Sequence, residues 1–223
     1  MSLILSIETA TTNCSVSLSK EGKTIVLKED NSKNYSHAES LHVFIDAVLK
    51  EANITSKDLD AIAISKGPGS YTGLRIGVSA AKGLCFAIGK PLISVPTLEA
   101  LAHQVDANDG VIVPMLDARR LEVYTAIFDA NYNEIKETEA KVLDANAFAE
   151  QLNQGKVYFI GNGVEKTKAL LNHPNAIFVE GILPSANQMS LLAFNKYKKA
   201  DFEDVAYFEP YYLKDFVALQ SSK

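Results

Sequence analysis

A glycine-rich loop between an apolar segment and a helical pattern is the stretch of this sequence best suited to bind an anion. Segment 60–65 has strand length, and Lys-Gly-Pro-Gly-Ser at 66–70 cannot continue it, because glycine permits positive φ and proline lacks an N–H. Thr72 is the expected cap of a helix over about 73–88. Backbone N–H groups at such a helix start attract anions. The candidate nucleotide-binding residues are therefore Gly67, Gly69, Ser70 and Thr72.

Two other features limit this expectation. The loop matches neither G-x-x-x-x-G-K-[ST] nor G-x-G-x-x-G, and glycine loops often serve only as turns. A structural turn is therefore the first interpretation of the loop, and nucleotide contact within an assembly is the second.

Two carboxylates at expected strand ends are the candidates for acid–base or metal chemistry. Glu8 closes the apolar segment 3–8, and Asp117 closes the segment 111–117. A carboxylate at Glu8 can orient a metal-bound water near a phosphate or cap the following polar turn, and both interpretations stay open. No metal site is predicted, because the four histidines lack the i, i+4 spacing of a helical metal pair. They are His37, His42, His103 and His173, and the first two are expected at the surface or an edge.

Two similar runs of elements are expected to position these residues. The first run has strands at 3–8, 14–19 and 24–29, a helix at 37–52 capped by Ser36, the strand–loop–helix unit 60–88, and a strand and helix over 92–105. The second has strands at 111–117, 122–128, about 135, 157–160 and 177–179, with helices at 144–152, 163–171 and 185–197. This order predicts an α/β fold of two like lobes, 1–105 and 106–223, with a cleft between them.

Bulk composition narrows the class of protein. The chain has 223 residues, of which 47% are hydrophobic and 22% charged, as in ordinary globular proteins. Its net charge of −5 makes the chain alone a poor nucleic-acid binder. The two cysteines are isolated in apolar segments, and neither a signal peptide nor a membrane-length apolar run is recognised. A cytoplasmic protein without membrane contact is expected.

The two helices of the first lobe carry more apolar surface than one core face needs. Leu74, Val78, Ala81 and Cys85 form one stripe of the second helix, and a second stripe has mostly small side chains. One explanation is a helix packed between a sheet and a neighbouring helix, and the other is contact with another chain. The candidate interface residues are Val43, Phe44, Ile76, Ala80, Gly83 and Ala87.

Five segments together resemble a known protein family. They are LSIETATTNCSVSL, KGPGSYTGLRIGVSAAKGL, ISVPTLEALA, MLDARRLEVY and EPYYLKD, and the GPGS-Y-TGLRIG block is the most specific. The resemblance is to the TsaB (YeaZ-type) family, the accessory subunits of bacterial tRNA threonylcarbamoyladenosine synthase. It extends from Leu3 to Leu213 and weakens in the last third.

The resemblance implies the actin/Hsp70/sugar-kinase (ASKHA, ribonuclease H-like) fold with two lobes. It implies a non-catalytic scaffold role in forming N6-threonylcarbamoyladenosine beside the tRNA anticodon, the transfer being made by a paralogous TsaD-like catalytic subunit. Helices of the first lobe pair with that subunit, a TsaE-like ATPase binds across the pair, and tRNA is met indirectly through the complex. A homodimer is expected for the chain alone. No cofactor is expected on the isolated chain, while ATP or ADP with Mg belongs to the complex interface.

The chain also departs from its relatives at positions that matter for chemistry. Thr97 and Leu101 stand where the catalytic paralogue carries an H-x-x-x-H metal pair, and neither side chain offers an imidazole. Glu8 stands where an aspartate is usual. The alternative function is a free-standing ATP-dependent phosphotransferase using Glu8 and Asp117. A metallopeptidase, which the family's glycoprotease label suggests, is the least supported.

Overall fold

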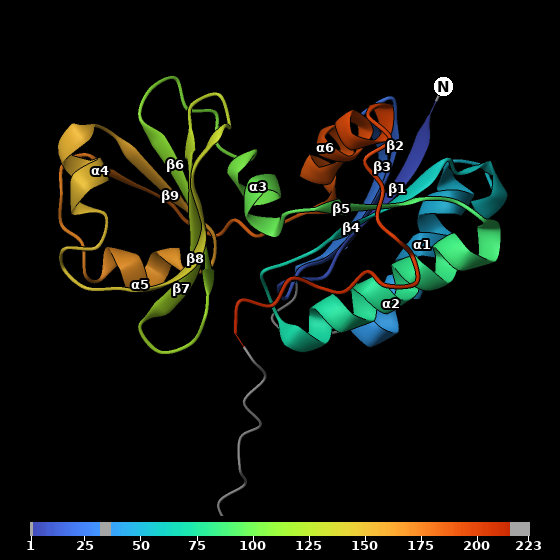
Figure 1. Ribbon diagram of the computed structural model, residues 1–223, viewed down its shortest axis with the longest axis horizontal. Coiled ribbons are helices and arrows are strands. Elements are labelled where there is room, and N and C mark those ends of the chain that lie inside the picture. The colour runs from blue at the N-terminus through green and yellow to red at the C-terminus, as the bar shows by residue number, and fades with distance from the viewer. Residues whose placement is uncertain (1, 32–36, 215–223) are drawn as a thin grey trace, which may run out of the picture.

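The computed structural model describes residues 2–31 and 37–214, which form two lobes, each built on a five-stranded sheet (Figure 1). The first sheet contains β1 (Leu3–Glu8), β2 (Cys14–Lys20), β3 (Lys23–Asp30), β4 (Ala61–Ser65) and β5 (Leu92–Val95). Its order is β3-β2-β1-β4-β5. The first three strands form an antiparallel meander, and β4 and β5 continue the sheet parallel to β1.

The second sheet repeats this topology. It contains β6 (Val111–Asp117), β7 (Glu122–Asp129), β8 (Glu134–Val142), β9 (Val157–Ile160) and β10 (Ala176–Val179). Its order, β10-β9-β6-β7-β8, places an antiparallel meander on one side of β6 and parallel strands on the other. Two lobes with the same mixed-sheet order form the actin/Hsp70/sugar-kinase (ASKHA) arrangement, and the predicted fold class is confirmed.

Helices cover both faces of the first sheet (Figure 1). On one face lie α1 (His37–Glu51) and α2 (Tyr71–Ile88), and a short 3₁₀ turn, η1 (Ser56–Asp58), precedes β4. Leu5 and Ile7 of β1 belong to the core beneath these helices. Ile4 belongs to the core under α6 (Ala186–Lys198) on the opposite face, because successive strand side chains alternate in direction.

The serine face of β2 explains how α6 lies so close to the sheet. Ser15, Ser17 and Ser19 are buried rather than exposed to water. Ser17 Oγ donates to the Ala186 carbonyl at 2.8 Å, and the Ala186 N–H donates to Ser15 Oγ at 3.0 Å. Short hydroxyl side chains therefore let the helix approach and also satisfy its first turn.

Helices also cover both faces of the second sheet. On one face lie α4 (Ala149–Gln154) and α5 (Val164–Lys168), and α3 (Thr97–Ala102) packs on the other. All three are shorter than predicted. The helix expected from residue 144 begins at Ala149, because Asp144 instead holds a turn in which its carboxylate accepts the Asn146 N–H at 2.8 Å.

The predicted lobe boundaries need correction at the end of the chain. Helix α6 lies on the first sheet, and Glu203 pairs with Leu92 at the edge strand β5. Val205 and Phe208 then pack against the first lobe's core. The predicted second lobe, 106–223, therefore ends before α6, because the chain crosses back at about residue 184.

Two remaining expectations concern particular segments. The predicted cap Ser36 lies outside the described residues. Among the residues the structure describes, no helix has the length and hydropathy needed to span a membrane.

Candidate functional site

The glycine loop leads into α2 through a serine cap. Ser70 has an extended backbone, and its Oγ accepts the Gly73 N–H at 3.3 Å. The helix therefore begins at Tyr71, and the prediction of Thr72 as the cap is wrong. At the other end Gly89 adopts the left-handed conformation with φ 64°, as a C-terminal glycine cap does.

The amides of this loop mostly serve the protein itself. The Gly67 N–H donates to Thr97 Oγ1 at 3.1 Å, and the Ser70 N–H donates to the Ala10 carbonyl at 2.7 Å. Pro68 between them has no N–H to offer. This geometry favours the structural-turn interpretation. Nucleotide contact by Gly67, Gly69, Ser70 and Thr72 stays a prediction.

Glycines allow the turn after β1 to press against α2. A Cβ on Gly73 would lie 2.2 Å from the Thr9 carbonyl oxygen, and one on Gly77 would lie 2.2 Å from Thr9 Oγ1. A Cβ on Gly69 would lie 2.5 Å from the Ala10 carbonyl oxygen. The glycine pattern is therefore required for close packing between the β1–β2 turn and the helix.

Glu8 lies at the centre of this packing. Its carboxyl is fully buried, with Oε1 accepting the Ala10 N–H at 2.6 Å and the Ser65 hydroxyl at 2.9 Å. Burial raises the pKa of Glu8 to about 7, although these hydrogen bonds partly offset the effect. Oε2 has no partner among the described residues. Of the two interpretations of Glu8, the structure favours the turn cap.

Asp117 lies in a different environment on the second lobe. It is exposed, and its Oδ1 pairs with Lys166 Nζ at 2.6 Å and accepts the Arg119 N–H at 2.7 Å. Asp117 therefore ties the β6–β7 turn to α5 at the surface of the second lobe, while Glu8 is enclosed in the first lobe.

The C-terminal segment covers the glycine loop. The Tyr211 N–H donates to the Lys66 carbonyl at 2.7 Å, and the Tyr212 ring lies 5.0 Å from the Tyr71 ring. Lys82 Nζ donates to the carbonyls of Ala206 and Phe208 at 3.1 and 2.9 Å. The expectation that this aromatic tail packs back on the body is confirmed.

An apolar surface on α1 and α2 remains uncovered in the described chain. Val43 is 61% exposed, and Gly83 and Ala87 are also exposed. The other three predicted interface residues, Phe44, Ile76 and Ala80, are half-buried against the first lobe's core. We call the exposed set, Val43, Gly83, Phe86 and Ala87, the α1–α2 surface.

Phe86 is the member of this surface that sequence reasoning missed. Its side chain is 87% exposed, more than any other large hydrophobic residue described. It lies outside both apolar stripes of α2, so the helical periodicity did not indicate it as an interface residue. The sequence did contain one indication, which is a phenylalanine at a helix position outside the apolar stripe that faces the core.

The histidines do not gather. His37 was expected at the surface or an edge but is buried, with Nε2 2.6 Å from the Thr11 carbonyl oxygen. His103 stacks on Tyr132 with ring centroids 4.0 Å apart. In the described chain, no three His, Cys, Asp or Glu side chains form a group that could hold a metal ion.

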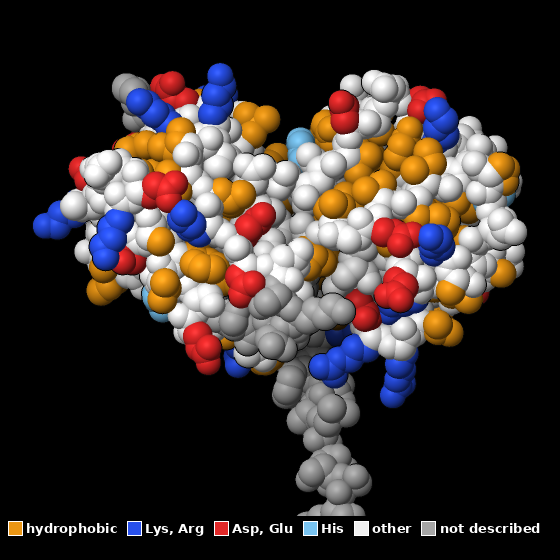
Figure 2. All heavy atoms as spheres, turned by 180° about the vertical axis from the view of Figure 1, so that it is seen from behind, with side chains coloured by type: hydrophobic (Ala, Val, Ile, Leu, Met, Phe, Trp, Pro, Cys, Tyr) orange, Lys and Arg blue, Asp and Glu red, His pale blue; other side chains and the backbone are white. Residues whose placement is uncertain are grey.

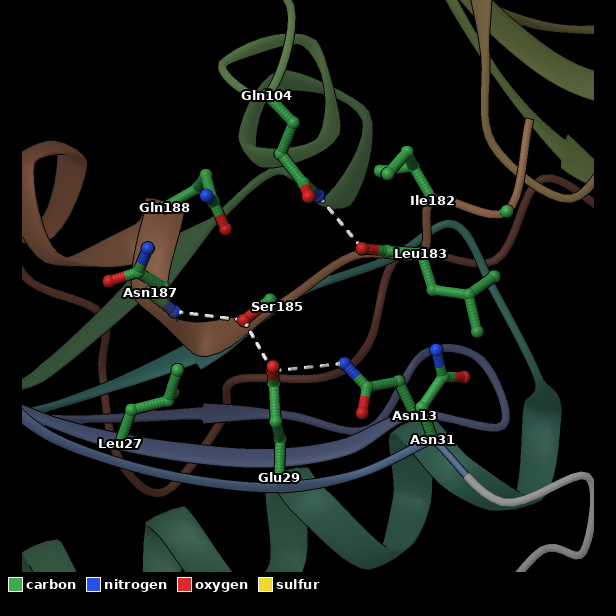
Figure 3. A pocket seen from close by; sticks show the side chains of 11 residues that line it. Asn13, Leu27, Glu29, Asn31, Gln104, Ile182, Leu183, Ser185, Asn187 and Gln188 are labelled. Atoms are coloured by element: carbon green, nitrogen blue, oxygen red, sulfur yellow. Dashed lines mark hydrogen bonds between the residues drawn. The ribbon is translucent and has the colours of Figure 1, made fainter. Parts of the chain in front are cut away.

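A polar cavity of about 210 Å³ lies where α6 begins (Figure 3). Glu29 Oε2 accepts the Ser185 hydroxyl at 2.8 Å and the Asn13 amide at 3.4 Å. Gln104 Nε2 donates to the Leu183 carbonyl at 2.8 Å on the opposite side. These bonds fix the crossing from the second lobe back to α6.

Comparison with known proteins identifies the family to which this two-lobed fold belongs. The model of a family described as TsaD, tRNA N6-adenosine threonylcarbamoyltransferase, matches residues 30–221. The Escherichia coli (strain K12) protein named tRNA threonylcarbamoyladenosine biosynthesis protein TsaB is 31% identical over 224 residues, covering 96% of each chain. This chain belongs to the TsaB family.

Other TsaB relatives and solved structures agree. The Bacillus subtilis (strain 168) TsaB protein is 35% identical over 125 residues, or 56% of this chain and 54% of that protein. A structure titled YeaZ from Pseudomonas aeruginosa aligns with TM-score 0.77 and 26% identity over 96% of this chain and 100% of that one. A second, described as similar to peptidase YEAZ from the same organism, aligns with TM-score 0.79 and 25% identity over the same shares.

Within this TsaB chain, the positions of the paralogue's histidine pair have structural roles. Thr97 Oγ1 accepts the Gly67 N–H, and the Thr97 N–H donates to the Gly67 carbonyl at 3.1 Å. Leu101 is buried in the core between α3 and the second sheet. One position therefore supports the glycine loop, and the other fills the core.

Proposed function

We propose that this chain is the non-catalytic scaffold subunit of a tRNA threonylcarbamoyladenosine synthase, acting in the cytoplasm. It pairs with a TsaD-like catalytic subunit through the α1–α2 surface, and a TsaE-like ATPase joins the pair. The observation that carries the proposal is the exposed Phe86 and Val43 on the two helices of the first lobe. An aromatic residue left in water on a helix is the kind of anchor that buries in a partner's groove.

The closed interior supports a scaffold rather than a free enzyme. Glu8, the carboxylate best placed for phosphate chemistry, is fully buried and bonded to Ala10 and Ser65. Tyr211 covers the glycine loop. Within the loop, the Gly67 N–H donates to Thr97 Oγ1 and the Ser70 N–H donates to the Ala10 carbonyl. A substrate phosphate would have to displace these contacts.

Phe86→Asp is expected to weaken binding to the TsaD-like subunit by about 100-fold or more, because a carboxylate replaces a buried aromatic anchor. Isothermal titration calorimetry of the purified subunits measures this. Ile135→Asp, a matched change at a 58% exposed isoleucine on β8, should leave the affinity unchanged. Both variants should remain folded by circular dichroism, since neither side chain is buried in the chain.

We expect the α1–α2 surface also to form the interface of a homodimer when the chain is isolated. Phe86→Asp should then convert a dimer to a monomer in sedimentation experiments. Parent-like affinity of Phe86→Asp for the catalytic subunit would contradict the proposed interface, wherever the homodimer forms.

Nucleotide titration separates the scaffold from the alternative phosphotransferase. We propose that ATP or ADP with Mg binds at the joint surface of the complex and that the chain alone binds neither. Calorimetry with Mg·ATP should therefore show heat only when the catalytic subunit is present. Tight binding with turnover by the chain alone would favour a kinase using Glu8 and Asp117.

A further inference from the structure

The turn between β6 and β7 holds two arginines in an unfavourable backbone conformation. Arg119 and Arg120 have φ of 70° and 49°, the only consecutive left-handed residues other than glycine in the described chain. Glycine, and less often asparagine, normally occupies such positions, because a Cβ crowds the backbone at positive φ. The turn thus carries two arginines at positions where glycine or asparagine would suit the backbone better.

The backbone of this turn is held from several sides. Lys166 Nζ donates to the carbonyls of Arg120 and Glu122 at 3.0 and 2.7 Å. The Arg119 N–H donates to Asp117 Oδ1, and the Ala118 N–H donates to the Glu122 carbonyl at 3.0 Å. The surrounding residues therefore fix the position from which the two arginine side chains extend.

The neighbouring carboxylates are already neutralised by lysines. Asp117 pairs with Lys166, and Glu122 pairs with Lys214. Neither guanidinium has a hydrogen bond or ion pair within the part of the chain that the structure describes, and both arginines are exposed. Four basic side chains thus face two carboxylates, which leaves a local positive surplus on a chain of net charge −5.

This surplus lies at the end of the second lobe where α5 and the β6–β7 turn meet. Figure 2 shows Lys and Arg side chains at the lower edge of the lobe on the right. Two exposed guanidiniums without a protein partner among the described residues, on a turn held by the hydrogen bonds above, suit an extended polyanion that runs across the surface. Arginine recognises phosphate through two parallel N–H···O bonds, so the rigid turn adds orientation to charge.

We propose that Arg119 and Arg120 bind the phosphodiester backbone of tRNA in the assembled complex. This rests on the proposed function, and it replaces the expected indirect contact with a direct one. The contact is a positioning one: it supplies affinity that depends on salt and carries no base recognition.

The decisive variant is Arg119→Asn with Arg120→Gly, which removes both charges and places residues that tolerate positive φ at both positions. In the complex with the catalytic subunit, affinity for unmodified tRNA should fall about tenfold at 0.1–0.15 M salt. The slope of log affinity against log salt should shrink by about 1.5, for two lost phosphate contacts. Thermal stability should be equal to or above the parent's.

Arg119→Lys with Arg120→Lys is the matched control, since it keeps the charges and the residue class at both positions. It should retain most of the salt slope and lose part of the affinity, because lysine cannot make bidentate bonds. Pairing with the catalytic subunit, measured separately without tRNA, should be that of the parent for both double variants.

Parent-like tRNA affinity and salt slope in the Asn-Gly variant would overturn this proposal while leaving the scaffold function standing. Weaker binding of Mg·ATP with unchanged tRNA binding would also overturn it, by showing a nucleotide-phosphate contact instead. Failure of the parent chain to pair with the catalytic subunit would sink the proposed function itself, and the pairing measurement reports that independently.

Discussion

Gly73→Ala is expected to lower the free energy of unfolding by about 3 kcal/mol, although alanine is the better helix former. The new methyl group would lie 2.2 Å from the Thr9 carbonyl oxygen, well inside van der Waals contact. That oxygen belongs to the backbone of the turn after β1, which is tied to the loop by the Ser70–Ala10 hydrogen bond. Relief therefore requires a shift of backbone on both sides, which urea unfolding measures.

Gly83→Ala is the matched control ten positions further along α2. A methyl group there would meet no described atom beyond the helix's own backbone. Measured at concentrations where the chain is monomeric, it should raise the free energy of unfolding by about 1 kcal/mol, the ordinary difference in helix propensity. If both variants were stabilised alike, the close approach of the β1–β2 turn to α2 would be wrong.

The strands and the two-lobe order were predictable because their signals are local. Apolar segments such as 3–8, 61–65 and 92–95 have strand length and end at turn residues. The repeated order of elements then indicated the like lobes that the two sheets confirm. Helix starts were less predictable, since Ser70 and Thr72 both offer a hydroxyl and only the backbone decides between them.

Long-range docking was not predictable from the same signals. Helix α6 follows the second lobe in sequence but packs on the first sheet, where the serine face of β2 accepts its first turn. Alternating serines indicate a strand face, but they do not say whether water or a helix covers it. The lobe boundary at the end of the chain was therefore misplaced.

At the candidate site, residue types were visible but environments were not. The carboxylate of Glu8 was recognised at a strand end, yet its full burial depends on the meeting of the β1–β2 turn with the glycine loop 66–70. Phe86 was overlooked, because exposure of an apolar residue is a property of the assembled surface rather than of its period.

The buried carboxyl of Glu8 makes stability depend on pH in a direction opposite to that of a salt-bridged acid. Burial raises its folded pKa from 4.5 to about 7, so the folded chain keeps a proton that the unfolded chain has released. Between pH 4.5 and 7 the unfolded state binds fewer protons, and this group's contribution to the free energy of unfolding falls as pH rises. Above pH 7 the buried Glu8 carboxyl lowers the free energy of unfolding by about 3 kcal/mol relative to its contribution below pH 4.5.

Glu8→Gln is expected to remove that loss of stability while keeping an oxygen acceptor for Ala10 and Ser65. The difference in free energy of unfolding between variant and parent should grow from near zero at pH 4.5 to about 3 kcal/mol at pH 8. Urea unfolding across this range measures it, and taking the difference cancels the titration of buried His37 and half-buried His103. Glu165→Gln, the same change at an exposed side chain of α5, should show no such growth. A Glu8→Gln variant that loses stability as pH rises would mean that the ionised carboxylate is the form the fold requires.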